Sequence, residues 1–382
     1  MRDILPAEKR DREQLLGIIR GAYLERGFQE IETPALEELD RLTSGQGGDN
    51  EKLVFKVLRR GEELERALES NEELADLGLR FDLTVPLTRF FASNQAKLPR
   101  VFKAIQIGPV WRAERPQKGR YRQFLQCDID IIGESSELAE IELISASLAA
   151  LDAIGLPGAT IRINDRRLLS AALREIGIDS DTQKALIAID KLDKIGISGV
   201  ASEIEEHYGL EIARATKDWL EKGIGAELPE ALAWAANLPG ISDRLVFDPT
   251  LVRGMGYYTG AIFEISHPDV DYSIGGGGRY DEMVGRWSGT SAPAVGISLG
   301  IERIMDLAPV QSAGQKSVVL LIENDFGQAL QLQRELIAKG YSVRLERRAK
   351  NTKAQLAELA AAGFDSFASV GEGAELDIKP LS

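Results

Sequence analysis

Apolar residues near the start of the chain recur at helical spacing. They fall every three or four positions, at Leu15, Ile18, Ile19, Ala22 and Tyr23. This pattern predicts a helix over residues 7–26 that ends at Gly27, because glycine is favoured just beyond a helix C-terminus. The next stretch, FQEIETPALE, has an extended pattern, and we expect it to break at Pro34.

The middle of the chain alternates between strand and helix patterns. Residues 101–133 have the pattern of two strands joined by ERPQKGR, and residues 134–154 have that of a helix that opens with serine and acidic residues. Residues 165–240 lack strong strand signals, which predicts an inserted helical module. Glycine is then dense over residues 253–300, where YTGAIFEIS and APAVGISLG are predicted to be extended.

In the last part of the chain the hydrophobic pattern again alternates between the periods of a strand and of a helix. Within residues 316–382, SVVLLIEN, YSVRLER and FDSFASVGE have strand patterns, and the helical patterns GQALQLQRELIAKG and NTKAQLAELAAAG lie between them. Such alternation predicts a small α/β domain. The segment APVQSAGQK before it has the composition of a linker.

The second predicted strand of residues 101–133 has one face that is unusually polar. Its side chains alternate, so one face carries Phe124, Gln126, Asp128 and Asp130 and the other carries Leu125, Cys127, Ile129 and Ile131. If the two strands pair antiparallel, Arg112 stands beside the polar row. An arginine, a ring, an amide and carboxylates would suit a nucleotide together with an amino acid. The alternative is a sheet face that simply contacts solvent.

Composition bounds the class of protein. The chain has 382 residues, of which 44% are hydrophobic and 28% charged, and this length suits two or three domains of a folded soluble protein. No apolar run reaches the ~18 residues that a membrane span needs. The charged start, MRDILPAEKRDREQ, does not resemble a signal peptide. One cysteine and two histidines exclude an intrachain disulfide, a cysteine-cluster zinc site and a histidine-rich metal centre, so we expect a cytoplasmic protein.

Positive charge gathers in two places although the whole chain has a formal net charge of −14. One stretch contains a single acidic residue, Glu114, and eight basic residues: Lys97, Arg100, Lys103, Arg112, Arg115, Lys118, Arg120 and Arg122. A second stretch contains a single acidic residue, Glu346, and six basic residues: Lys339, Arg344, Arg347, Arg348, Lys350 and Lys353. The overall acidity argues against nonspecific nucleic-acid binding, whereas these stretches leave a local phosphate-binding surface open beside the alternative of a solvated face.

Several other motifs have a structural explanation as well as a functional one. GGGGRYD could cradle a phosphate, but glycine runs more often form turns or allow close backbone approach, and the P-loop spacing is absent. GYYTG could be packed aromatic residues. Arg253 lies between apolar neighbours and therefore needs a partner, which favours a functional role. We expect His207 and His267 to lie on the surface.

Taken together, these segments resemble histidyl-tRNA synthetases, a family of class II aminoacyl-tRNA synthetases. WRAERPQKGRYRQF resembles motif 2, GFQEIETPALE resembles motif 1 with its proline at Pro34, and AVGISLGIERI resembles motif 3 with its arginine at Arg303. LVRGMGYYTGAIFEI and GGGGRYDEMV are similar to the two histidine-specific signatures, and LRFDLTVPLTRF is similar to the substrate segment. The resemblance extends from about residue 2 into the C-terminal α/β domain.

The resemblance implies a fold and an activity. The fold would be an α+β catalytic domain over residues 1–310, with the antiparallel sheet and flanking helices of class II synthetases and a helical insertion at about 165–240. Residues 316–382 would form an anticodon-binding-like α/β domain, which looks shortened. The activity would be ATP-dependent activation of L-histidine and its transfer to tRNA(His). ATP and Mg2+ would be required, and the protein would be a homodimer built partly through the Pro34 segment.

The resemblance also implies roles for individual residues. Catalysis would use Arg112 and Arg253. ATP would be bound by Arg112, Glu114, Phe124 and Arg303. Histidine would be bound by Asp82, Leu83, Thr84, Arg112, Gln126, Asp130, Arg253, Tyr257 and Tyr258. The acceptor end of the tRNA would be contacted by Arg115, Lys118 and Arg120, and no residue is expected to hold a resident metal.

One departure and two alternatives accompany this interpretation. Gly256 stands where the family signature commonly has aspartate. A non-catalytic relative, like the regulatory subunit of ATP phosphoribosyltransferase, shares the fold, but it usually lacks the C-terminal domain and the catalytic arginines that this chain keeps. A synthetase-like enzyme that transfers its adenylate to a small acceptor is the third possibility.

Overall fold

The computed structural model describes residues 1–43, 50–114, 121–221, 228–253, 256–289, 291–309, 316–371 and 376–381. The chain divides into two compact units, one comprising Met1–Asp3 and Leu15–Pro309 and the other Ile4–Gln14 and Val310–Ser382. No helix in these ranges is long and apolar enough to cross a bilayer.

The N-terminal elements lie within two residues of where the hydrophobic pattern predicts them. Helix α1 (Pro6–Leu24) is followed by Gly27, whose φ of 78° ends the helical path. Strand β1 (Gln29–Ile31) and strand β2 (Leu36–Glu38) lie on either side of Pro34. Both predictions, the helix and the break in the extended segment, are confirmed.

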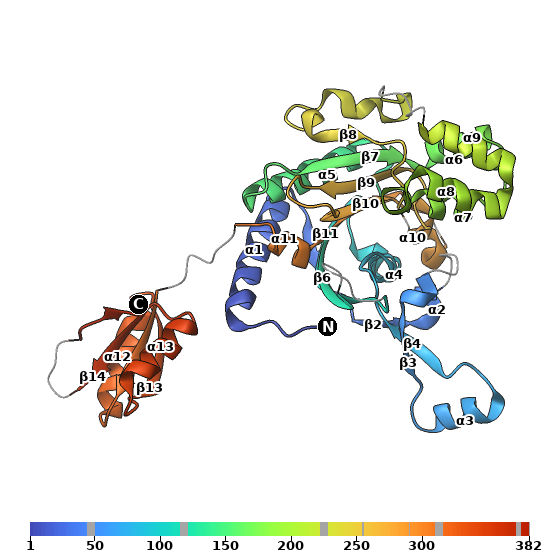
Figure 1. The fold of residues 1–382 in the computed structure, drawn as a ribbon. Helices are drawn as coiled ribbons and strands as arrows, with labels where there is room; N and C mark the ends of the chain where they lie inside the picture. The colour runs from blue at the N-terminus through green and yellow to red at the C-terminus, as the bar shows by residue number, and fades with distance from the viewer. Residues whose placement is uncertain are drawn as a thin grey trace. The chain divides into compact units, whose positions relative to one another are not determined.

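A small sheet and several helices come next. Strands β2, β4 (Ala75–Leu79) and β3 (Phe55–Leu58) form a three-stranded sheet in that order, and helix α3 (Glu62–Ser70) connects β3 to β4. Figure 1 shows α3 at the far end of this hairpin. The other elements of this region are α2 (Leu39–Thr43), the 3-10 turn η1 (Asn50–Leu53), α4 (Thr84–Asn94) and η2 (Gln95–Lys97).

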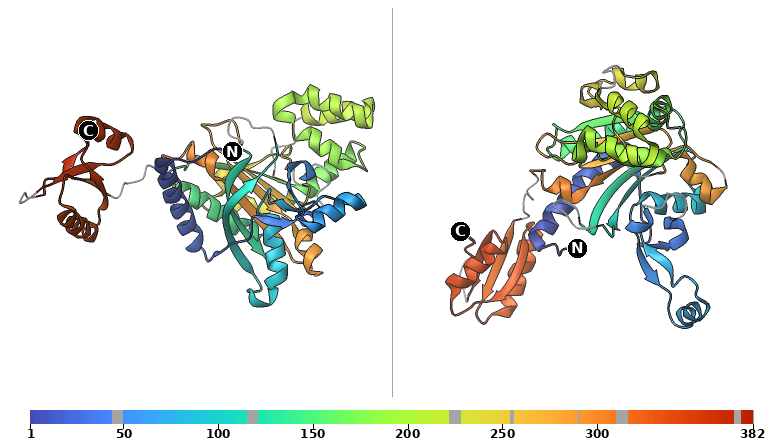
Figure 2. Two further views of the ribbon diagram at one scale, coloured as in Figure 1. Left: turned by 90° about the horizontal axis from the view of Figure 1, so that it is seen from below. Right: turned by 45° about the vertical axis from the view of Figure 1, so that its right-hand side comes forward.

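A mixed, largely antiparallel sheet of eight strands organises the larger unit (Figures 1 and 2). Its order is β1-β5-β6-β11-β10-β9-β7-β8, and only the β1–β5 and β7–β8 pairs are parallel. The strands not yet given are β5 (Phe102–Trp111), β6 (Gln123–Ile132), β7 (Thr160–Asp165), β8 (Leu245–Phe247), β9 (Ala261–Ser266), β10 (Gly275–Arg279) and β11 (Ala294–Gly300). The two strands expected within residues 101–133 are β5 and β6, and they pair antiparallel with Val110 opposite Phe124.

The two faces of β6 meet different surroundings. Cys127, Ile129 and Ile131 are buried on the face that packs toward helix α5 (Leu138–Ala153) and Tyr23 of α1. The opposite face carries Gln126, Asp128 and Asp130, as the alternation of side chains predicts. The polar row therefore does not face bulk solvent but lines a pocket.

Helices fill most of the predicted inserted module. They are α6 (Arg166–Glu175), α7 (Thr182–Ile189), α8 (Leu192–Tyr208), α9 (Leu210–Glu221) and the 3-10 segment η3 (Glu230–Asn237), and η4 (Ser242–Arg244) follows them. Figure 1 shows α6–α9 gathered together beyond one end of the large sheet. The remaining helices of this unit are α10 (Asp281–Ser288) and α11 (Ile301–Met305).

The glycine run is a strand and not a turn. Gly275–Gly278 lie in β10, at the middle of the sheet between β11 and β9. A Cβ added to Gly277 would lie 1.9 Å from the carbonyl oxygen of Gly296. Close backbone approach, the other explanation of the motif, therefore accounts for the glycines.

One expectation about the histidines is wrong. His207 is exposed, but His267 is only 8% exposed. It follows β9 directly, and its Nδ1 accepts a hydrogen bond of 3.3 Å from the backbone N–H of Asp269. The turn that follows β9 folds the imidazole inward, against Gly158.

The smaller unit contains the expected α/β elements. Its sheet has the order β13-β12-β14-β15, formed by β13 (Ser342–Arg347), β12 (Ser317–Ile322), β14 (Ser366–Val370) and β15 (Lys379–Pro380). Alternate residues of the buried strand β12 pack with different helices. Val318 and Leu320 join the core of α12 (Phe326–Ala338), and Val319 joins that of α13 (Thr352–Ala361). The two helices thus cover opposite faces of this sheet.

The crowding at Gly277 gives a stability prediction. Gly277→Ala should lower the free energy of unfolding by about 1–3 kcal/mol or more, because the new methyl group meets rigid backbone atoms of β11. Gly17→Ala is the matched control, since Gly17 is an exposed α1 residue with nothing within 4 Å of an added Cβ. That control should gain up to about 1 kcal/mol. Urea unfolding measures both, and equal changes in the two variants would contradict the packing argument.

Candidate active site

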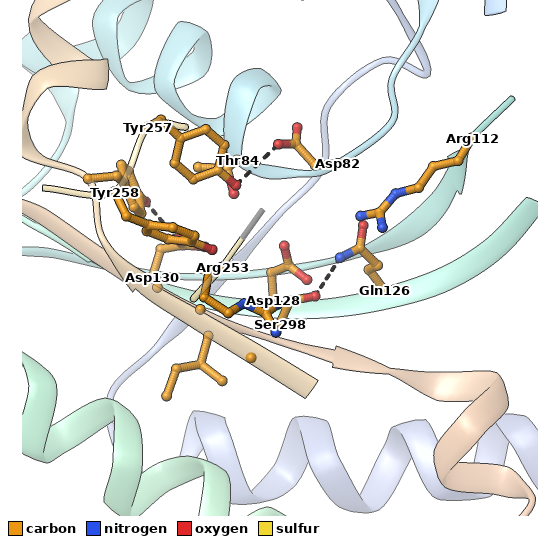
Figure 3. A pocket seen from close by; sticks show the side chains of 15 residues that line it. Asp82, Thr84, Arg112, Gln126, Asp128, Asp130, Arg253, Tyr257, Tyr258 and Ser298 are labelled. Carbon is orange, nitrogen blue, oxygen red and sulfur yellow. Dashed lines mark hydrogen bonds between the residues drawn. The ribbon is translucent and has the colours of Figure 1, made fainter. Parts of the chain in front are cut away.

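A pocket lies over the polar face of β6 and its neighbours β11 and β10 (Figure 3). Three segments cover it: the turn before α4, the end of β5 and the segment before β9. Its lining residues are Asp82, Thr84, Arg112, Gln126, Asp128, Asp130, Arg253, Tyr257, Tyr258, Gly276, Gly277, Tyr280, Gly296, Ile297 and Ser298. Segments far apart in the sequence thus meet here because the sheet order places β6, β11 and β10 side by side.

The β5–β6 hairpin places a cation and a ring together at one side of the pocket. The Arg112 guanidinium lies over the Phe124 ring, 5.0 Å from its centroid. Arg112 Nε also donates a 3.0 Å hydrogen bond to the carbonyl oxygen of Phe81, which fixes the direction of the side chain. Glu114 lies just beyond β5 and is exposed. An arginine stacked on an aromatic face keeps its outward donors available for an anion.

Three carboxyl groups from two segments are buried in the pocket. Asp82, Asp128 and Asp130 are each no more than 4% exposed. Burial raises the pKa of Asp82 to about 6 and that of Asp130 to about 7, and it raises the pKa of Asp128 well above its usual range. The mutual repulsion of neighbouring carboxylates adds to the shifts of Asp128 and Asp130. A cationic ligand would relieve this unfavourable burial of negative charge.

Hydrogen bonds orient the carboxyl groups. Asp82 Oδ1 accepts from the backbone N–H of Val85 at 3.2 Å, in the turn that Leu83 and Thr84 form at the start of α4. Asp130 Oδ1 accepts a 2.6 Å hydrogen bond from the Tyr280 hydroxyl. Each acid therefore presents its remaining oxygen in a fixed direction.

A chain of charged groups holds Arg253. Arg253 Nη1 lies 3.1 Å from Glu264 Oε2, and Glu264 Oε1 lies 2.9 Å from Arg162 Nη1. Arg162 in turn pairs with Asp248. The partner that Arg253 needs is thus Glu264 on β9, and the chain extends across β9 and β7 to the start of the segment after β8.

Tyrosines form another wall of the pocket. Tyr257 and Tyr258 are buried and pack edge to face, with their ring centroids 4.8 Å apart. The Tyr257 hydroxyl lies 3.5 Å from Asp82 Oδ2. The tyrosines are therefore both packed aromatics and parts of the pocket, which unites the two interpretations of GYYTG.

Other expected site residues lie elsewhere. Arg303 is not among the lining residues. Its guanidinium donates to the carbonyl oxygen of Ser273 at 2.6 Å and lies 5.4 Å from the centroid of the Tyr272 ring. Both carboxylate oxygens of the adjacent Glu302 accept from the backbone N–H of Leu125, at 3.1 and 2.9 Å, which ties α11 to β6. Arg115, Lys118 and Arg120 lie outside the residues that the structure describes.

Sequence reasoning missed three polar lining residues: Asp128, Tyr280 and Ser298. Asp128 was on the predicted polar face but received no role, although its position between Gln126 and Asp130 was the available signal. Tyr280 follows the glycine strand, and Ser298 faces Asp128 across the β6–β11 pair. Only the order of strands in the sheet brings these two to the site.

The chemistry of the pocket suits a small ligand with several charges. Arg112 and Arg253 can contact anionic groups, the three acids can contact an ammonium or another donor, and the tyrosines can contact an aromatic ring. An amino acid with an aromatic polar side chain, held beside a phosphate group, meets all three requirements.

Comparison with known proteins identifies the family. Residues 1–304 match the family described as "Histidyl-tRNA synthetase". The chain belongs to the histidyl-tRNA synthetase family. A protein named histidine–tRNA ligase from Leifsonia xyli is 53% identical, with 100% of this chain and 97% of the relative covered. Another of that name from Aeropyrum pernix is 36% identical, with 97% and 89% covered.

Solved structures agree with this family. A histidyl-tRNA synthetase from Nostoc sp. PCC 7120 superposes with a TM-score of 0.75 at 26% identity, with 100% of this chain and 93% of that chain covered. The predicted fold class, an α+β class II catalytic domain with a C-terminal α/β domain, is confirmed. A Bacillus halodurans protein titled as an ATP phosphoribosyltransferase regulatory subunit/histidyl-tRNA synthetase superposes with a TM-score of 0.73 at 22% identity, over 97% of this chain and 96% of that chain, and so shows the fold alone.

The raised pKa of Asp82 gives a pH prediction for the ligand-free protein. The folded state holds this proton more tightly than the unfolded state, so stability falls as the pH rises through the range between the unfolded pKa of about 4 and the folded pKa of about 6. Asp82→Asn keeps an acceptor for the Val85 N–H and removes the charge. It should therefore exceed the wild type in stability by up to about 3 kcal/mol at pH 7.5 and by little at pH 4.5.

Urea unfolding of both proteins at the two pH values measures this difference. The exposed Asp179→Asn serves as the control and should show no such growth with pH. A stability difference for Asp82→Asn that is the same at pH 4.5 and 7.5 would show that Asp82 ionises without cost.

Proposed function

We propose that this protein is a histidine–tRNA ligase, which activates L-histidine with ATP to histidyl adenylate and transfers the histidyl group to tRNA(His). The observation that carries the proposal is the pocket in which Arg112, stacked on Phe124, meets three buried carboxyl groups, Arg253 and two tyrosines. Relatives that bear this name match the whole length of the chain.

The nucleotide would bind at the β5–β6 hairpin. Phe124 would stack on the adenine, Glu114 would accept from its amino group, and Arg112 would contact the α-phosphate. Arg303 would hold the far phosphate end. Mg2+ would enter on the phosphates of its substrate ATP, whose oxygen atoms suit it as ligands.

Histidine would occupy the acidic half of the pocket. Asp82, Thr84, Gln126 and Asp130 supply acceptors for its ammonium group, with Leu83 shaping the turn between the first two, and Arg112 would hold its carboxylate. Tyr257 and Tyr258 would contact the imidazole. A pocket that hydrogen-bonds an imidazole rejects apolar analogues strongly, because such analogues leave its polar groups unpaired.

The reaction needs charge stabilisation more than proton transfer. When the substrate carboxylate attacks the α-phosphorus, negative charge gathers on the phosphate oxygens, and Arg112, Arg253 and Mg2+ would stabilise it. The ion pair with Glu264 holds Arg253 in place for this role. The second step, acyl transfer to a ribose hydroxyl, requires no protein nucleophile, and the buried Cys127 is not needed.

The macromolecular contacts follow the same assignment. Residues 1–310 would be the catalytic domain with the insertion at about 165–240, and residues 316–382 would contact the anticodon side of the tRNA. Arg115, Lys118 and Arg120 would contact the acceptor end. The protein would act as a cytoplasmic homodimer. The regulatory alternative is not favoured, because Arg112, Arg253 and Arg303 are all retained and the curated relatives are named as ligases.

ATP–pyrophosphate exchange with each of the twenty amino acids, with and without Mg2+, tests the proposal directly. Of the twenty amino acids, histidine alone should support exchange, because the pocket matches its imidazole and ammonium groups together. Exchange should also require Mg2+, which accompanies the ATP phosphates. Absence of exchange with every amino acid, from folded protein, would favour the regulatory function. Exchange with another amino acid would point to Gly256 as the first residue to change.

Two variants separate the activation step from the transfer step. Arg112→Ala should lower exchange by a factor of about 100–1,000, because a donor to the developing charge is lost. Lys118→Ala should leave exchange unchanged and weaken tRNA charging. Exchange and charging assays on both proteins measure this, and equal losses in both assays for Lys118→Ala would refute its assignment to tRNA.

A further inference from the structure

Ser298 links two pocket residues on the neighbouring strand. Gln126 Nε2 donates a 2.6 Å hydrogen bond to Ser298 Oγ (Figure 3), and the Ser298 hydroxyl lies close enough to the Asp128 carboxyl group to lower its pKa. The β6–β11 register places Ser298 directly opposite Asp128, with Gln126 two residues away on the same face. The three side chains thus form one connected row along the pocket floor.

The chemistry of this row dictates the direction of each hydrogen bond. A serine hydroxyl has one proton, and an Asp128 oxygen that carries no proton can only accept, so Ser298 donates to that oxygen. Its oxygen then has only lone pairs left, and Gln126 must turn its NH2 group toward Ser298. The carbonyl oxygen of Gln126 therefore points the other way, to the side of Arg112, as Figure 3 shows.

That carbonyl oxygen has no partner of its own. Gln126 Oε1 is buried and accepts no hydrogen bond from any described residue. A buried acceptor without a donor is costly, and the cost disappears when a ligand supplies the donor. With the amide reversed, its NH2 group would face Arg112 and the ammonium group of the ligand. All three are hydrogen-bond donors, so the NH2 group would repel the other two.

Two further unpartnered oxygens explain how Asp128 itself is held. Asp128 Oδ1 and Gln106 Oε1 are both buried without a partner among the described residues, and Gln106 lies directly opposite Asp128 on β5. A proton on Asp128 would give this pair its missing donor. Burial raises the pKa of Asp128 well above its usual range, in agreement with such a proton. The other oxygen remains the acceptor for Ser298.

We propose that Asp128 and Ser298 are positioning residues that lock the side-chain amide of Gln126, so that it presents its carbonyl oxygen as an acceptor to the ammonium group of the amino-acid substrate. This inference rests on the proposed function, which assigns the ammonium group of the substrate to Gln126, and adds the residues that orient Gln126 for it. Neither residue needs to touch the reacting atoms.

Calorimetric titration with L-histidine tests the lock. Ser298→Ala and Asp128→Ala should weaken binding roughly tenfold to a hundredfold, the range for a hydrogen bond to a charged group. Asp128→Asn should recover most of the loss seen in Asp128→Ala, because the amide oxygen can accept from Ser298 while its NH2 group faces Gln106. In the exchange assay, KM for histidine should rise and KM for ATP should not.

A ligand without the ammonium group distinguishes the proposed role from a purely structural one. Binding of the desamino analogue, 3-(imidazol-4-yl)propionate, should be insensitive to Ser298→Ala. Ser170→Ala, which removes a helix-surface hydroxyl bonded to the Arg166 carbonyl oxygen, should change neither ligand's affinity. If both ligands lose affinity equally in Ser298→Ala, the lock on Gln126 is wrong.

A double-mutant cycle gives the sharpest result. In the Q126E background both side-chain oxygens are acceptors, so no orientation has to be fixed and Ser298→Ala should cost less than about twofold. The same cost in both backgrounds would overturn the inference. If wild-type protein binds histidine and the alanine variants bind it as tightly, the lock falls and the proposed function stands. If the wild type does not bind histidine, both fall.

Discussion

Burial of three carboxyl groups in one pocket is the constraint on which the site depends. Taking a carboxylate out of water is unfavourable, and Asp82, Asp128 and Asp130 are close enough to repel one another. The fold compensates only in part, through the Tyr280 hydroxyl, the Val85 N–H and Ser298. What remains is a local excess of acceptors that a cationic substrate completes. The ligand-free protein is therefore less stable than it could be, and its affinity for a cationic ligand is higher as a result.

The backbone of β10 and β11 makes room for this arrangement. A Cβ on Gly296 would lie 1.9 Å from Asp130 Oδ1, and one on Gly276 would lie 2.8 Å from the Arg253 guanidinium. Larger residues at these positions would push the acid and the arginine out of the pocket. The glycines of β10 and β11 thus supply space where Asp130 of β6 and Arg253 supply charge, and β6 is matched to these two strands although about 150 residues separate them in the sequence.

Much of this site could be predicted from short-range patterns, and the rest could not. Alternation along β6 correctly placed Gln126, Asp128 and Asp130 on one face, and the isolation of Arg253 correctly indicated that it needs a partner. The roles of Tyr280 and Ser298 depend on β11 lying between β6 and β10, a long-range pairing that no local period encodes. His267 misled for a related reason, because a polar turn can fold its imidazole inward. The glycine run was ambiguous, since the same residue suits a turn and a crowded strand.

The buried face of β6 has a consequence for following the motions of the protein. Cys127, the single cysteine of the chain, is fully buried and its strand is paired on both sides, by β5 and β11. Burial also raises the pKa of its thiol, so little reactive thiolate is present. A thiol reagent can therefore reach Cys127 only when the centre of the sheet opens. The rate at which Cys127 is labelled therefore measures how often the sheet opens. Ligands that bind on the opposite face of the same strand should lower this rate.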